Sequence, residues 1–93
     1  ESILSGIPET LPALLYALKL QSTASRVGFD WETADGVREK INEEFAELSE
    51  AIANNSNIDI EDEIGDLMFS LVNLARKLDI DPDAALRRPN RQN

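Results

Sequence analysis

The sequence predicts an all-α fold, a small bundle of about four helices. Apolar residues recur at helical spacing in three successive segments, and candidate caps and turn residues separate these segments. Neither a period-two alternation nor a hairpin dipeptide argues for strands. The 93 residues suit one domain, which we divide into a linker or arm (residues 1–9) and a helical core with a short C-terminal helix (residues 10–93).

The first helix is predicted from about Leu11 to Ser25. Thr10 is a candidate N-cap, and Pro12 is tolerated because the first helical turn needs no backbone donor at that position. The leucines of this segment follow helical spacing: Leu11, Leu14, Leu15 and Leu18. The next residues, Arg26-Val-Gly-Phe-Asp-Trp31, break this periodicity with a glycine and clustered aromatics, which predicts an ordered loop.

The second helix is predicted from near Thr33 to about Ala53, with Thr33 or Asp35 as its cap. Asn54-Asn-Ser-Asn57 then predicts a stop and a turn. Because an α-helix turns by about 100° per residue, the apolar side chains form one narrow stripe that we expect to face the core. The members of this stripe are Val37, Ile41, Phe45, Leu48 and Ile52.

The third helix is predicted from about Ile60 to Leu78, with Asp59 as its N-cap. Gly65 lies mid-helix at a cost of roughly 1 kcal/mol relative to Ala, which suggests that another helix approaches closely there. Asp81-Pro82 is a cap followed by Pro at the first helical position, and it predicts a short fourth helix. The expected core face of the third helix consists of Ile64, Leu67, Met68, Leu71, Leu74, Ala75 and Leu78.

The composition excludes several classes of function. Without Cys or His the chain has no disulfide, no thiol nucleophile and no site that uses imidazole. The net charge of −9 repels nucleic acids and anionic membranes, so we expect neither as a partner. No spanning segment or signal peptide is recognisable, and we expect a cytoplasmic protein. Since the chain opens with Glu1 rather than Met, we expect it to be a piece of a longer one.

Four acids are predicted to converge between the second and third helices: Glu44, Glu47, Glu63 and Asp66. Helical rotation places Glu44 and Glu47 on one flank of the apolar stripe of the second helix. It places Glu63 and Asp66 on one flank of the core face of the third helix. A short turn favours antiparallel packing, which brings the flanks together. Glu43 and Glu50 come out nearly opposite the stripe and should face solvent.

Converging carboxylates repel one another and need a cation or a proton. Oxygen ligands on stiff helices favour Mg²⁺, with Mn²⁺ as an alternative, and no EF-hand pattern for Ca²⁺ is present. Glutamates three residues apart are also common on solvated helix faces. The second acidic pair, Glu63 and Asp66 on the next helix, makes a functional site the better interpretation.

These acids also carry a resemblance. The sequence resembles the E-E-x-x-E…E-x-x-D signature of the all-α nucleoside triphosphate pyrophosphohydrolases, and within them the MazG family. The matching residues are Glu43-Glu-Phe-Ala-Glu47 and, after a gap of fifteen residues, Glu63-Ile-Gly-Asp66. The similarity to C-terminal MazG domains spans roughly Ser5 to Asn90. It includes Gly6-Ile-Pro8, Leu11-Pro-Ala-Leu-Leu15, Lys19-Leu-Gln21, Arg26-Val-Gly-Phe-Asp-Trp31 and Val72-Asn-Leu-Ala-Arg76.

The resemblance implies a helical homodimer with a four-helix core built from both subunits. It implies an enzyme that hydrolyses NTP or dNTP to the monophosphate and pyrophosphate, in the manner of nucleotide-pool housekeeping. It also implies Mg²⁺ held by Glu44, Glu47, Glu63 and Asp66, the four acids that helix geometry selects. Glu44 or Glu47 is then the candidate for orienting the attacking water, and Glu43 is left for a cap or an outer contact.

Further residues are candidates for contact with substrate. Lys40 matches a family Lys that approaches phosphate, but it also has the spacing of an ion-pair partner of Glu44. Asn73, Lys77, Trp31 and Arg91 are weaker candidates. Phe69 lies off the core stripe of its helix, so we expect its side chain to be exposed, which suggests a subunit interface or a base contact. At the C-terminus Asn90 matches the family, whereas Gln92 stands where Lys is expected.

Two other functions stay open at this point. The chain could be a non-catalytic, metal-binding dimerisation or interaction module, or it could serve one particular dNTP or damaged nucleotide. Base and sugar selectivity depend on pocket shape, which the sequence does not define.

Overall fold

The computed structural model describes residues 12–28 and 33–91. Over these residues the chain forms four α-helices and no strand, so the all-α prediction is confirmed. The helices are α1 (Ala13–Arg26), α2 (Ala34–Ala53), α3 (Asn57–Lys77) and α4 (Pro82–Arg91). Helix α1 has Pro12 at its N-cap position and no side-chain cap, so the prediction of Thr10 as its cap is wrong. Thr10 itself lies outside the described residues.

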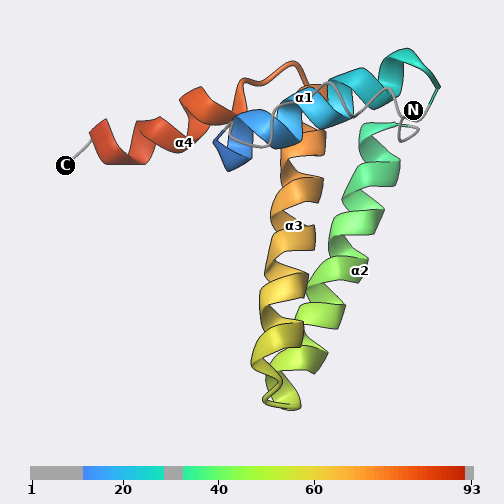
Figure 1. Cartoon of the computed structure of the whole chain (residues 1–93), viewed down its shortest axis with the longest axis vertical. Coiled ribbons are helices and arrows are strands. Elements are labelled where there is room, and N and C mark those ends of the chain that lie inside the picture. The colour runs from blue at the N-terminus through green and yellow to red at the C-terminus, as the bar shows by residue number, and fades with distance from the viewer. Residues whose placement is uncertain (1–11, 29–32, 92–93) are drawn as a thin grey trace.

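The helices α2 and α3 form a long antiparallel hairpin, as Figure 1 shows. Helix α1 lies across the open end of this hairpin and α4 leads away from the same end. Both α1 and α4 contact α3, and α1 also contacts α4. None of the described helices is both long and apolar enough to cross a bilayer.

Side-chain caps explain where α2, α3 and α4 begin. The Thr33 hydroxyl accepts a hydrogen bond from the Gly36 backbone N–H at 3.0 Å, which confirms Thr33 as the cap of α2. Asp81 Oδ1 accepts a hydrogen bond of 3.0 Å from the backbone N–H of Asp83 and starts α4 as predicted. The N-cap of α3 is Ser56, which accepts from the Asp59 N–H.

The prediction of Asp59 as the cap of α3 is therefore wrong. Asn55 adopts a φ of 57°, a left-handed conformation that Asn tolerates better than most residues. This residue reverses the chain within a very short turn, so the helix restarts at Asn57, three residues earlier than the expected Ile60.

The predicted core faces of α2 and α3 are only partly covered. Phe45 and Met68 are each 60% exposed, and Leu71 is 48% exposed. The reason is architectural: two helices bury the residues between them, and a second layer is needed to cover the outer half of an apolar stripe. The exposed members of the predicted faces are Phe45, Ile52, Ile64, Met68, Leu71 and Leu78.

Gly65 does not mark a close contact within the chain. A Cβ placed on it would meet nothing within 4 Å. The close helix approach inferred from its mid-helix position is therefore wrong for the single chain.

Candidate functional site: an acidic cluster in the hairpin

The buried seam of α2 contains a carboxylate. Val37, Glu44 and Ala51 are the buried residues of this helix, and their spacing of seven puts them on one face. Glu44 is only 5% exposed. The face of α2 that packs against α3 is therefore not centred on the predicted apolar stripe. It is shifted around the helix toward the flank on which the acids were predicted.

Three of the four predicted acids come together across the hairpin. Glu44 of α2 and Glu63 and Asp66 of α3 each offer a carboxylate oxygen, and these oxygens lie within 4.8 Å of one another. Glu63 is half-buried and Asp66 is exposed. The cluster therefore opens from a buried end at Glu44 to solvent at Asp66.

Glu47, the fourth acid, lies next to the same cluster. Burial, then the charge of Glu47 and hydrogen bonds with Glu44 and Glu47, raise the pKa of Glu63 to about 7. Glu47 itself is exposed, as are Glu43 and Glu50, which face solvent as predicted. Crowding by neighbouring carboxylates thus favours the protonated form of Glu63.

Two buried oxygens of the cluster lack a donor. Glu44 Oε1 and Glu63 Oε1 are both inaccessible to solvent and have no hydrogen-bond partner among the described residues. Buried carboxylate oxygens without donors are costly. An all-oxygen donor set that is short of positive charge fits a hard divalent cation such as Mg²⁺ or Mn²⁺.

Lys40 supplies a positive charge at the cluster. Its Nζ lies 3.2 Å from Glu44 Oε2, one helical turn along α2. The hydrogen bond to Glu44 and the charge of that carboxylate raise the pKa of Lys40. The predicted ion pair is present, and the Lys40 side chain is still 47% exposed.

Two of the four weaker substrate candidates, Asn73 and Lys77, lie further along α3. Asn73 is buried, and its Oδ1 accepts a hydrogen bond of 2.8 Å from Arg76 Nη2. Lys77 is half-buried at the end of α3. Trp31 lies outside the described residues, and so does the side chain of Arg91 at the end of α4. A substrate role for these four residues stays a prediction.

Sequence reasoning overlooked Gln21. This residue is 1% exposed and donates a hydrogen bond from Nε2 to the Phe69 carbonyl. Phe69 is half-buried, so the expected exposure of its side chain is wrong. The signal was available, because Gln21 follows Leu14 and Leu18 at helical spacing and therefore occupies a core position of α1.

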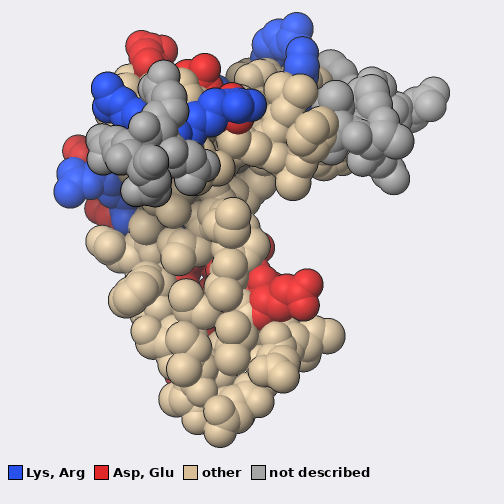
Figure 2. Space-filling view, turned by 90° about the vertical axis from the view of Figure 1, so that its left-hand side faces the viewer, with Lys and Arg blue, Asp and Glu red and all other residues tan. Residues whose placement is uncertain are grey.

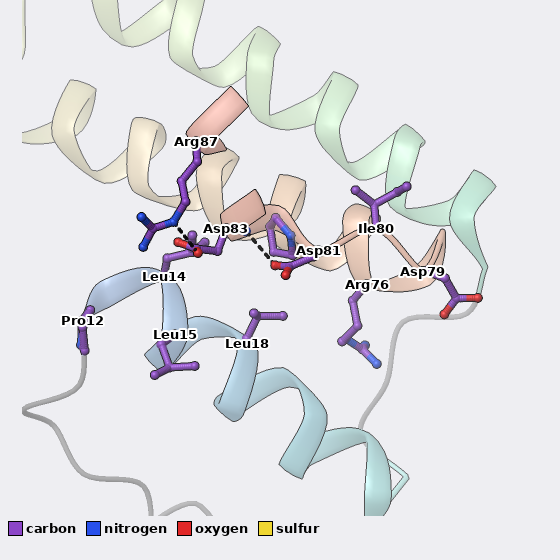
Figure 3. Close-up of a pocket in the computed structure, with 11 residues that line it drawn as sticks. Pro12, Leu14, Leu15, Leu18, Arg76, Asp79, Ile80, Asp81, Asp83 and Arg87 are labelled. Atoms are coloured by element: carbon purple, nitrogen blue, oxygen red, sulfur yellow. Dashed lines mark hydrogen bonds and ion pairs between the residues drawn. The ribbon is translucent and has the colours of Figure 1, made fainter. Parts of the chain in front are cut away.

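A separate hollow lies between α1 and the chain that joins α3 to α4. Figure 3 shows Leu14, Leu15 and Leu18 on one side and Asp83 paired with Arg87 on the other. None of the four clustered acids lines it. Figure 2 shows basic and acidic side chains together toward this end of the molecule, and a separate acidic patch midway along a largely uncharged face.

The known proteins to which this chain is similar are named as pyrophosphohydrolases. The family model of phosphoribosyl-ATP pyrophosphohydrolase (PRA-PH) matches residues 12–93. The chain is 47% identical over 91 residues to the nucleoside triphosphate pyrophosphohydrolase/pyrophosphatase MazG of Thermotoga maritima, covering 98% of this chain and 34% of that protein. It is 42% identical over 93 residues to a nucleoside triphosphate pyrophosphohydrolase of Escherichia coli K12, covering 96% and 35%.

The chain spans about a third of the length of these relatives. Within that span the match includes all four clustered acids and every described helix. The chain therefore belongs to the phosphoribosyl-ATP pyrophosphohydrolase family, in the all-α superfamily that also contains the MazG proteins.

Proposed function

We propose that this protein hydrolyses nucleoside triphosphates, NTP or dNTP, to the nucleoside monophosphate and pyrophosphate. The observation that carries the proposal is the cluster of Glu44, Glu63 and Asp66, with two buried oxygens that lack donors. The names of the two relatives support the same reaction. The proposed role is control of the nucleotide pool in the cytoplasm.

Mg²⁺ or Mn²⁺ is the proposed cofactor, held by Glu44, Glu47, Glu63 and Asp66. When bound, such an ion neutralises phosphate charge and lowers the pKa of a coordinated water. In the reaction a water oxygen bonds to phosphorus, the anhydride bond between the α- and β-phosphates breaks, and pyrophosphate leaves. Glu44 or Glu47 is our candidate for orienting that water.

The triphosphate needs positive charge beyond the metal. Lys40 is the candidate at the cluster, because its ammonium is half-exposed beside Glu44. Weaker candidates for contacts with the rest of the nucleotide are Asn73, Lys77, Trp31 and Arg91. Positioning and charge neutralisation suffice for this chemistry, which needs no covalent nucleophile.

We infer that the protein acts as a homodimer. An apolar surface on α2 and α3 is exposed in the single chain, and contiguous apolar surface of this kind is typical of an interface. A two-fold axis would set one hairpin against another and complete a four-helix core. The residues of this surface are Phe45, Ile52, Ile64, Met68 and Leu71.

The test is incubation of the purified chain with Mg²⁺ and a panel of NTPs, dNTPs and phosphoribosyl-ATP, with detection of pyrophosphate and monophosphate. Release of both products from the common nucleotides supports the proposal. Orthophosphate and diphosphate would show that another bond is cut. Metal binding without any release of pyrophosphate would favour the non-catalytic module, and full activity of Glu47→Gln would contradict the site.

A further inference from the structure

The two oxygens of the Glu44 carboxylate lie in different surroundings. Oε2 is 3.2 Å from Lys40 Nζ. Oε1 is buried and has no hydrogen-bond partner among the described residues. The Lys40 ammonium therefore holds one oxygen of this carboxylate, and the other oxygen remains available to a different partner.

The pair spans the boundary between surface and interior. The side chain of Glu44 is 7% exposed, whereas that of Lys40, one turn earlier on α2, is 47% exposed. The last torsion of a Glu side chain is broad and has no sharp preference of its own. The direction of the Glu44 oxygens must therefore come from the contacts of the carboxylate. Glu63 is one neighbour in the cluster, and Lys40 supplies the cationic contact, at Oε2.

We infer that Lys40 is a positioning residue for Glu44. By holding Oε2 it turns Oε1 toward the space shared with Glu63 and Asp66, where a divalent cation would accept it as a ligand. This inference rests on the proposed metal site and adds a task for Lys40 that is independent of substrate. Partners that orient a ligand in this way typically change metal affinity by about 10- to 100-fold when they are removed.

Charge and positioning predict opposite signs for the loss of Lys40. An ammonium next to the site repels a divalent cation, so if charge alone mattered its removal would tighten metal binding. If orientation matters more, removal frees the carboxylate to rotate and weakens metal binding. The sign of the change thus separates the two effects without any measurement of catalysis.

The experiment is calorimetric titration of Mn²⁺ into the metal-free protein without nucleotide. We expect Lys40→Met to bind Mn²⁺ about tenfold more weakly, and Lys40→Arg to recover most of the affinity. Arg38→Met is the matched control: it removes one positive charge from α2, but Arg38 pairs with Asp35, and both side chains are exposed. This control should bind as the parent does, or slightly more tightly.

A second measurement needs no metal. In excess chelator, Lys40→Met should lower the melting temperature more than Arg38→Met does, because it leaves the buried Glu44 carboxylate without its cation. In a Glu44→Gln background the same change should have little further effect on Mn²⁺ affinity, since Lys40 then has no ligand to orient.

Equal or tighter Mn²⁺ binding by Lys40→Met would overturn the inference, and so would an equal effect of Arg38→Met. A parent protein that binds Mn²⁺ and hydrolyses triphosphates while Lys40→Met binds equally well refutes this inference alone. A parent that binds no Mn²⁺ at all refutes the proposed metal site and the inference together.

Discussion

The side-chain amide of Gln21 on α1 donates a hydrogen bond of 2.9 Å to the backbone carbonyl of Phe69 on α3. Since a carbonyl can only accept, this contact fixes the amide with Nε2 toward Phe69 and Oε1 turned away. Oε1 is buried without a partner among the described residues. The bond ties together two helices whose contacting residues are 48 positions apart.

Substitution of Gln21 should show whether its donor Nε2 or its unpaired acceptor Oε1 has the larger effect on stability. Gln21→Met removes the donor and the unpaired acceptor together, so we expect the free energy of unfolding to stay within about 1 kcal/mol of the parent. Gln21→Glu sets a buried carboxylate against the Phe69 carbonyl and should cost about 3 kcal/mol or more at neutral pH. Urea unfolding of both variants gives the comparison, and equal losses would contradict this account.

Loss of an acid from the cluster should abolish most of the activity. We expect Asp66→Asn to lower kcat/KM by about 100-fold or more if Asp66 is the proposed metal ligand, because such a ligand supplies several kcal/mol of transition-state stabilisation. Steady-state release of pyrophosphate measures the effect. Glu50→Gln is the matched control, since this exposed acid on α2 lies away from the cluster; a comparable loss there would point to overall charge rather than to the site.

The stability of the metal-free protein should depend on pH through Glu63. Its pKa is about 7 in the folded chain against an ordinary value of 4.5, so between these values the folded state binds more protons than the unfolded state. The free energy of unfolding should therefore fall as pH rises through this window and level off above it. Denaturant unfolding at several pH values in chelator measures this slope.

The variant Glu63→Gln provides the control for that pH profile. A neutral amide cannot titrate, so the fall in stability between the two pKa values should largely disappear. A slope that persists in this variant would assign the titration to another group.

Self-association should depend on the exposed apolar surface of the hairpin. Met68→Glu places a charge within this apolar surface. We expect the dimer to be at least tenfold weaker by sedimentation equilibrium, with helix content retained. Leu86→Glu on α4 is the matched control, because Leu86 is similarly exposed, at 64%, but lies outside this surface. If only the control disrupts the dimer, the interface has been misplaced.

Gly65→Ala tests whether the mid-helix glycine is a constraint within one chain. Because a Cβ there would meet nothing within 4 Å, the substitution should raise the free energy of unfolding by about 0.5–1 kcal/mol through helix propensity. Unfolding should be followed in the Met68→Glu background, in which we expect the proposed dimer to be weakened. A loss of stability in that background would show that the space beside Gly65 is occupied after all.

Much of the fold could be predicted from local patterns. Periodicity identified the first three helices and the Asp81-Pro82 cap signal identified the fourth, because spacing and caps are properties of neighbouring residues. The start of α3 was missed because Ser56 and Asp59 are both good caps. The choice depended on the left-handed turn at Asn55, which a propensity argument does not specify.

The acidic cluster was predictable for a related reason. Glu44 and Glu63 lie on two helices joined by a short turn, so helical rotation alone decides whether they meet. The depth of burial was not predictable in this way. The apolar stripe suggested that Phe45 faces the core, whereas the seam runs through Glu44, because an isolated hairpin has nothing to cover the outer half of the stripe. Gln21 was missed because its partner is a backbone carbonyl distant in sequence.

The short turn at Asn54 and Asn55 also has a kinetic consequence. Every acid of the cluster belongs to one hairpin, so the contacts that assemble it are local, and structures rich in local contacts fold fast. The hairpin can therefore close before α1 docks through Gln21. Mutual repulsion of the carboxylates acts against that early closure. A divalent cation bound at the proposed site should therefore raise the folding rate of this chain.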